Sequence, residues 1–364
     1  MQSLFRQGAE QMRAGNAAAA EAAFRKATEL DPAFAPAQLD LGLAQLKEGK
    51  LLEAIASIRK SLELDPSSPG AHLFLGIAEY QSNNSDGALR DLHLAIKEDP
   101  KNVQALTWIG IVELNAGHPE LASEPLDRAA ELAPTDENVL DYRVQAHMAV
   151  AKQSYTALYK VDPASWRLHR LNAVIDAQAD DHKGAITEYQ SAIKLAPNDA
   201  ELYEGMGWEY RKLGQADEAA KAFAEQLRLS PGNPIAMYNL GSAQVDSGHE
   251  REALPLLEQV VKIYNHPTGA DYYLGRALAA EGKEDDAIAA FKRATTLEGE
   301  MQRRAWYQLS QTYRHLGKTA DARQAALKYE QLKKAADEAS AKEVEDWRKL
   351  NAANAAAVSN SGQQ

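Results

Sequence analysis

The side chains that most often carry chemistry are scattered along this 364-residue sequence. Nine histidines fall in different segments, and Gly248-His249-Glu250 lacks the second histidine, four residues on, that a zinc-binding helix would supply. Asp180-Asp181-His182 could attract a cation, although clustered polar residues are ordinary in a solvated turn. The sequence contains no glycine-rich phosphate loop, nucleophile elbow or kinase signature. We therefore predict no enzyme activity, no cofactor and no metal site.

Composition narrows the classes of partner. The formal net charge of −12 argues against a general nucleic-acid or anionic membrane surface, and no run of 18 apolar residues could insert into a membrane. The absence of cysteine excludes disulfides and thiolate metal sites. It favours an exported, periplasmic bacterial protein over a cytoplasmic one without identifying the compartment. We also expect that a segment preceding Met1 has been removed, because Leu4 and Phe5 already occupy repeat positions.

A repeated unit of 34 residues organises the chain, and prolines at positions 32, 66, 100 and 134 mark its period. Twelve residues before each of these prolines lies an alanine, and four residues beyond that alanine lies a larger apolar side chain, as in Ala122 and Leu126. Turn glycines such as Gly117 divide most units into two amphipathic stretches, and proline ends the second. We expect the large side chain to fill the space between one unit and the next. Short links then predict stacked antiparallel helix pairs.

Met237…Leu240-Gly241 and Trp306…Leu309-Ser310…Tyr313…Ala322 carry parts of a known signature. Over about residues 1–330 the sequence resembles the tetratricopeptide repeat family, in ten units. The resemblance implies an all-α fold, a right-handed superhelical α-solenoid of about ten helix-turn-helix units with a C-terminal capping helix. It also implies a non-enzymatic scaffold for protein–protein interaction, of the large bacterial multi-repeat type.

The repeat spacing predicts five segments. Residues 1–136 hold four regular repeats, and residues 137–199 are irregular because five residues and a turn glycine are missing. There we predict a shortened helix pair, 138–148 and 149–161, which is either a hinge or simple drift in a tolerant fold. Residues 200–330 form a second regular stack. Residues 331–350 continue as a capping helix extension, and the small polar residues of 351–364 predict a disordered tail.

The first helix of each unit should line a concave inner wall, which is where this architecture binds partners. The first four units present mainly aliphatic and aromatic side chains, whereas the last four present Tyr, Trp, Arg and amides, the composition of interaction hot spots. An aromatic side chain at helical spacing is equally often core. The candidate groove residues are Leu39, Leu43, Leu73, Phe74, Ile77, Tyr80, Trp108, Ile111, Tyr142, Arg170, Trp208, Arg211, Tyr238, Asn239, Tyr272, Tyr273, Arg276, Tyr307, Gln311 and Arg314.

These residues predict that the chain binds a protein or peptide in the groove. The family's clamp for chaperone C-termini is excluded, because Asn239 is the only clamp residue present and Gly269 and Tyr273 replace its cations. Two alternatives stay open. The uncapped first repeat, with Leu4, Phe5 and Met12, could form a homo-oligomer. The chain could also be the adaptor part of a larger multidomain enzyme.

Overall fold

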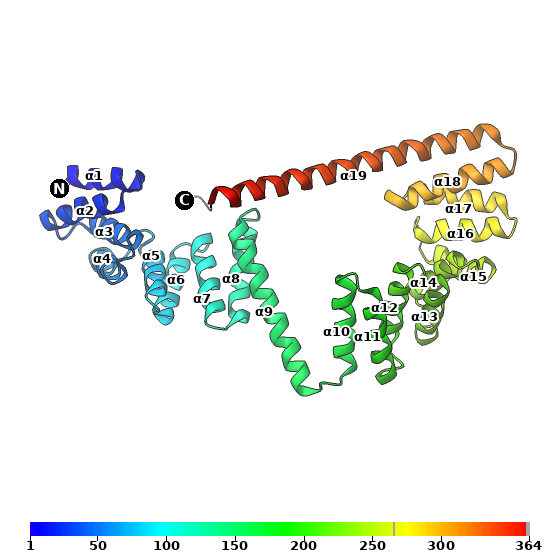
Figure 1. Ribbon diagram of the computed structural model, residues 1–364, viewed down its shortest axis with the longest axis horizontal. Helices are drawn as coiled ribbons and strands as arrows, with labels where there is room; N and C mark the ends of the chain where they lie inside the picture. Colours follow the sequence, from blue (N-terminus) through cyan, green and yellow to red (C-terminus); the bar gives the residue numbers. More distant parts are fainter. Residues whose placement is uncertain (265, 362–364) are drawn as a thin grey trace. The chain divides into compact units, whose positions relative to one another are not determined.

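The computed structural model describes residues 1–264 and 266–361, which contain nineteen helices and no strand (Figure 1). The chain divides into two compact units, Met1–Val161 and Asp162–Gln364. The helices of the first unit are α1 (Gln2–Arg13), α2 (Ala17–Leu30), α3 (Ala35–Lys47), α4 (Leu51–Leu64), α5 (Ala71–Gln81), α6 (Ser85–Glu98), α7 (Val103–Asn115), α8 (Pro119–Leu132) and α9 (Glu137–Val161).

The second unit holds ten helices. They are α10 (Trp166–Gln178), α11 (His182–Leu195), α12 (Ala200–Lys212), α13 (Ala216–Leu229), α14 (Pro234–Asp246), α15 (Glu250–Ile263), α16 (Gly269–Ala280), α17 (Glu284–Ala294), α18 (Gly299–His315) and α19 (Thr319–Ser361). Within each unit every helix packs on its neighbours in the chain, so that α1–α8 make four pairs and α10–α19 make five (Figure 1). This packing confirms the predicted all-α solenoid of paired helices.

Local sequence explains where the helices begin and end, as α7 and α8 illustrate. The side chain of Asn102 caps α7 by accepting a hydrogen bond from the backbone N–H of Ala105 at 2.9 Å. Gly117 then turns the chain with φ at +81°, a left-handed conformation that suits glycine best. Pro119 opens α8, where its missing N–H has no helical partner to lose.

The small and large repeat positions pack directly on each other inside a pair. A Cβ added to Gly110 of α7 would lie 2.3 Å from Cγ of Leu126 on α8, and Leu126 is fully buried. The same relationship joins Gly8 to Phe24 and Gly275 to Phe291. Leu126 also clusters with Ala146 of α9, as expected for a side chain between one unit and the next, and in addition it fills the gap left by the glycine of its own unit.

The irregular region differs from the prediction. Instead of two short helices, residues 137–161 form the single helix α9. The stretch contains no glycine or proline that could break it, so the five-residue deletion fuses the two helices. Ala151 is exposed and Tyr155 is only half-buried, whereas the equivalent Ala122 and Leu126 are fully buried. The division between the two compact units falls at the end of α9, inside the segment for which we predict a hinge.

The last helix, α19, covers the part of the chain for which we predict a capping helix and a disordered tail. Ala322 and Ala325 of α19 are buried against the final repeat, and α19 packs along α18. The helix then continues through the predicted extension, where most side chains of residues 331–349 are exposed. The helix runs on to Ser361, where the sequence analysis expects disorder, because the alanine-rich run after Asn351 favours helix. Residues 362–364 of that expected tail lie outside the described residues. None of the helices described is long and apolar enough to cross a membrane.

Candidate functional site

The first helices of the C-terminal repeats, α12, α14, α16 and α18, bring arginine, tyrosine and tryptophan side chains together. Arg211 of α12 donates to the Ser242 hydroxyl at 3.1 Å and to the Asp246 carboxylate at 3.2 Å, both on α14. The same guanidinium donates to the Tyr273 hydroxyl of α16 at 3.0 Å. One side chain thus links three consecutive first helices.

Asp246 is shared between two guanidinium groups. In addition to Arg211, Arg276 of α16 donates to this carboxylate at 2.8 Å and to the backbone carbonyl of Val245 at 3.1 Å. The side chains of Arg211, Asp246 and Arg276 are 19%, 29% and 27% exposed, so water and partners can reach them. We call Arg211, Asp246, Tyr273 and Arg276 the arginine cluster. It carries one more positive than negative charge.

Aromatic rings flank the arginine cluster. The Arg211 guanidinium lies 5.0 Å from the centre of the Trp208 ring, within the range of a cation–π interaction, and Trp208 is 38% exposed. Tyr238 packs edge-on against Tyr273 with 6.0 Å between ring centres. Burial raises the pKa of Tyr238 to about 12, and burial also raises the pKa of Tyr273. Both hydroxyls therefore stay protonated at neutral pH and keep a donor.

A second group of side chains forms a pocket of about 380 Å³ where α16, α18 and α19 meet. We call it the α18/α19 pocket. The rings of Tyr307 and Tyr329 lie 5.4 Å apart in its wall, and Tyr307 is 44% exposed. The lining residues are Tyr272, Glu300, Arg303, Arg304, Tyr307, Tyr329, Lys333 and Asp337. Arg304 also lines a neighbouring pocket of about 360 Å³ with Arg211 and Asp246, so it lies between the arginine cluster and the α18/α19 pocket.

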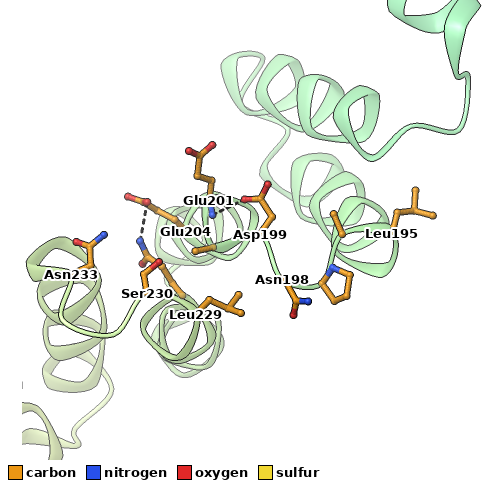
Figure 2. Close-up of a pocket in the computed structure, with 12 residues that line it drawn as sticks. Leu195, Asn198, Asp199, Glu201, Glu204, Leu229, Ser230 and Asn233 are labelled. Carbon is orange, nitrogen blue, oxygen red and sulfur yellow. Dashed lines mark hydrogen bonds between the residues drawn. The ribbon is translucent and has the colours of Figure 1, made fainter.

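Figure 2 shows a larger pocket, of about 840 Å³, at the loops before α12 and α14. We call it the acidic pocket, because Asp199, Glu201 and Glu204 lie around it. Each of the three already has a partner in the chain: Asp199 caps α12 by accepting from the Glu201 N–H at 3.0 Å, Glu201 accepts from Arg170 at 3.1 Å, and Glu204 accepts from Gln226 at 2.8 Å. No metal-binding group of three His, Asp or Glu side chains occurs among the residues described.

The wall of the N-terminal unit is more apolar. Tyr80 and Trp108 pack with 5.7 Å between ring centres, and Asn115 donates to the Tyr80 hydroxyl at 2.9 Å. Leu39 and Leu43 of α3 and Phe74 of α5 are also half-buried. Asp40 interrupts this surface, and burial raises the pKa of its carboxyl above the usual value of 3.8.

The structure separates the candidate groove residues into two groups. Buried side chains belong to the core of this chain and support the wall from behind: Leu73, Ile77, Ile111, Asn239, Tyr272 and Tyr273. Half-buried or exposed side chains are free to contact a partner: Leu39, Leu43, Phe74, Tyr80, Trp108, Tyr142, Arg170, Trp208, Arg211, Tyr238, Arg276, Tyr307, Gln311 and Arg314. We retain only the second group as candidate contact residues.

Sequence reasoning missed the charged and aromatic residues that the structure adds to the site: Asp246, Glu300, Arg303, Arg304, Tyr329, Lys333 and Asp337. Asp246 and Arg304 lie on first helices, but outside the positions that the repeat spacing predicts to face the groove. A signal for the pocket was present in the adjacent arginines 303 and 304 in the first turns of α18. No comparable signal marks Tyr329 and Lys333, because they come from the second helix of the last pair.

The family model described as Tetratricopeptide repeat matches residues 5–69, 74–137, 138–200 and 272–340, and a second model of the same description matches residues 210–277. The chain belongs to the tetratricopeptide repeat family. Repeats of this family support a role as a protein–protein interaction scaffold, which is the role predicted from the sequence. In α18 the family pattern is carried by Trp306, Leu309 and Tyr313.

Several relatives share part of the chain. Superkiller protein 3 of Saccharomyces cerevisiae is 29% identical over 91 residues, which cover 25% of this chain and 6% of that protein. The BBSome complex member bbs-4 of Caenorhabditis elegans is 25% identical over 188 residues, which cover 48% of this chain and 41% of that protein. The chain therefore spans less than half the length of these two relatives.

Solved tetratricopeptide repeat structures are similar at low identity. MamA (residues 41 to the end) from Desulfovibrio magneticus RS-1 has 23% identity and a TM-score of 0.43, covering 47% of this chain and 96% of that one. A tetratricopeptide repeat protein from Parabacteroides merdae has 17% identity and a TM-score of 0.35, covering 76% of this chain and 98% of that one.

Proposed function

We propose that the C-terminal unit binds a segment of another polypeptide along the groove formed by α12, α14, α16 and α18. The observation that carries this proposal is the arginine cluster, which ties three of these helices together while Trp208 beside it stays exposed. Because the cluster is fixed by hydrogen bonds within the chain, its side chains lose little freedom when a partner binds.

The chemistry of the groove suits a polypeptide. Exposed Trp208 and Tyr307 offer rigid apolar area with a polar edge, the combination that is enriched in interaction hot spots. Arg211 and Arg276 present donors that can reach backbone carbonyls or carboxylates of a partner. A small-molecule site would instead be expected to enclose its ligand in a largely apolar cavity.

Capture from a lysate of the source organism tests the proposal. The variant Trp208→Ala/Tyr307→Ala removes the two exposed rings of the groove and should lose the proteins that the intact chain retains, as read by mass spectrometry. Trp347→Ala/Tyr159→Ala is the matched control, since these rings are 64% and 54% exposed but lie on α19 and α9, outside the groove. Circular dichroism should give the same helicity for all three proteins. If the groove variant retained the same partners as the control, the groove would not be the binding surface.

Self-association through the first repeat is the alternative that the structure favours less. Phe5 already packs against Phe24 and Phe34 of its own unit, with ring centres 5.7 Å and 5.3 Å apart. Leu4, Phe5 and Met12 are half-buried, so a second copy would find little apolar area there. Light scattering over a range of concentrations decides this point, because a strict monomer removes the alternative. The adaptor hypothesis is decided by the full reading frame of the gene.

A further inference from the structure

The α18/α19 pocket has more basic than acidic side chains in its lining, in contrast to the chain as a whole. The whole chain has a formal net charge of −12, yet three basic side chains, Arg303, Arg304 and Lys333, line this pocket against two acidic ones. We propose that the pocket binds acidic side chains of the extended segment that the groove holds. This inference rests on the proposed function and names the chemistry of its partner.

Two of the three cations lack a counter-charge. Arg304 forms an ion pair with Glu300 one helical turn away. Neither Arg303 nor Lys333 forms an ion pair within the part of the chain that the structure describes, and the remaining acidic residue, Asp337, lies on the exposed extension of α19. Arg303 is half-buried as a residue and lines the pocket without an ion pair to a carboxylate among the residues described. A partner carboxylate would supply the missing bond.

The positive region extends beyond one pocket. Arg304 joins the α18/α19 pocket to the neighbouring pocket that contains Arg211 and Asp246, where two guanidiniums share a single carboxylate. One terminal carboxylate is too small to reach both places. The arrangement therefore fits a segment with several aspartate or glutamate side chains better than it fits a chain end.

The aromatic wall gives the pocket a second kind of contact. Tyr307 and Tyr329 line the same pocket as the cations, and a tyrosine offers both apolar ring area for the stem of an acidic side chain and a hydroxyl that can donate to its carboxylate. Tyr272 closes the pocket on the α16 side and is 5% exposed.

The acidic pocket sets the direction of the bound segment. It lies at the loops before α12 and α14, where Glu201 and Glu204 line the cavity in Figure 2, and α12 comes three first helices before α18 in chain order. An acidic stretch is repelled at α12 and attracted at α18, so a segment with one acidic end binds in a single orientation.

A titration with three labelled twelve-residue peptides tests the proposal on the full chain. The first alternates glutamate with glycine and has both ends blocked. The second has glutamine in place of glutamate and blocked ends, and the third is the glutamine peptide with a free C-terminal carboxylate. We expect the glutamate peptide to bind and its affinity to fall as salt is raised, because ionic contacts are screened. The blocked glutamine peptide should not bind measurably.

Charge variants locate the contact. Arg303→Gln/Lys333→Gln should weaken binding of the glutamate peptide about tenfold, the size expected for two lost charge-assisted contacts. The matched control Arg251→Gln/Lys221→Gln removes the same charges from α15 and α13, where the side chains are 85% and 71% exposed. An equal loss in the control would mean that only net charge matters and would overturn the proposal. If the glutamine peptide with a free C-terminal carboxylate bound as tightly as the blocked glutamate peptide, the pocket would recognise a chain end, and the proposal would be overturned.

The variant Trp208→Ala/Tyr307→Ala separates this inference from the proposed function. Suppose that Trp208→Ala/Tyr307→Ala lowers the affinity for the peptides and Arg303→Gln/Lys333→Gln does not. The groove would then stand as the binding surface, and the proposed preference for acidic side chains would fail. If no captured protein or peptide depended on Trp208 and Tyr307, the proposed function itself would fail.

Discussion

The guanidinium of Arg211 on α12 donates to the carboxylate of Asp246 on α14 at 3.2 Å, which ties two consecutive first helices across the groove of the C-terminal unit. Arg276 donates to the same carboxylate. Asp246 therefore pairs with two guanidinium groups that could otherwise pair with a carboxylate of a partner. Asp246 thus holds Arg211 and Arg276 in position, and it also competes with the carboxylates of an acidic partner for them.

Neutralising this carboxylate should strengthen binding of an acidic segment. Asp246→Asn keeps an oxygen acceptor for Arg211 and Arg276 but removes the charge, so we expect the blocked glutamate peptide to bind about threefold more tightly at low salt. Fluorescence anisotropy measures the change. Asp217→Asn, on an exposed residue of α13, is the control and should have little effect. Weaker binding by Asp246→Asn would contradict a cationic groove.

The pairing of Gly110 with Leu126 makes a stability prediction. Gly110→Ala should lower the free energy of unfolding by about 2 kcal/mol, because its Cβ would overlap the Leu126 side chain in a packed interface. Leu126→Ala alone should cost about 3 kcal/mol through the cavity that it leaves. In the double variant the new methyl enters that cavity, and the combined cost should be smaller than the sum. Strict additivity in urea denaturation would show that the two positions do not touch.

Glu21 predicts a loss of stability in acid. Its carboxylate accepts from Lys50 at 2.6 Å, and the hydrogen bonds from Lys50 and then Arg25 lower the pKa from 4.5 to about 2. The folded state therefore holds the proton less tightly than the unfolded state, so the stabilisation is complete above pH 4.5 and disappears as pH falls towards 2. Glu21→Gln should cost about 1 kcal/mol at pH 7, since both partners are half exposed to solvent. The difference from the parent should shrink steadily in urea titrations between pH 5 and 2.

Asp40 predicts the opposite trend. Burial raises the pKa of its carboxyl, so the ionised group opposes folding at neutral pH and this penalty is relieved as pH falls through the raised pKa. Asp40→Asn should therefore raise the midpoint of thermal unfolding at pH 7. At pH 3 the parent and the variant should melt together. A lower midpoint for the variant at pH 7 would mean that the carboxylate makes a favourable contact.

The sequence predicts the paired helices well, because Gly110 and Leu126 and their equivalents recur in phase and only one packing satisfies all of them. It does not predict α9, since a five-residue deletion can shorten two helices or fuse them, and the choice depends on whether residues 151–161 find a surface to bury. Most of these side chains are exposed, and the helix continues without a break.

The candidate site is predicted only in part. Trp208, Arg211 and Arg276 are placed on the wall by their spacing alone, but Tyr272 is core because the rotation of α16 turns it towards Phe291, with 6.3 Å between ring centres. The α18/α19 pocket also needs Lys333, which comes from α19, the second helix of the last pair. The repeat spacing predicts contact residues only on first helices, so this position is not among them.

The most direct test uses the tryptophans as reporters in a nitrogen–proton NMR titration of the indole groups. Trp208 lies at the arginine cluster, whereas Trp108 lies in the N-terminal unit and Trp347 on the exposed extension of α19. With the blocked glutamate peptide, the Trp208 signal should move and saturate while the Trp108 and Trp347 signals stay in place. An unmoved Trp208 signal at saturating peptide, or the same movement with the blocked glutamine peptide, would contradict a C-terminal groove that binds an acidic polypeptide.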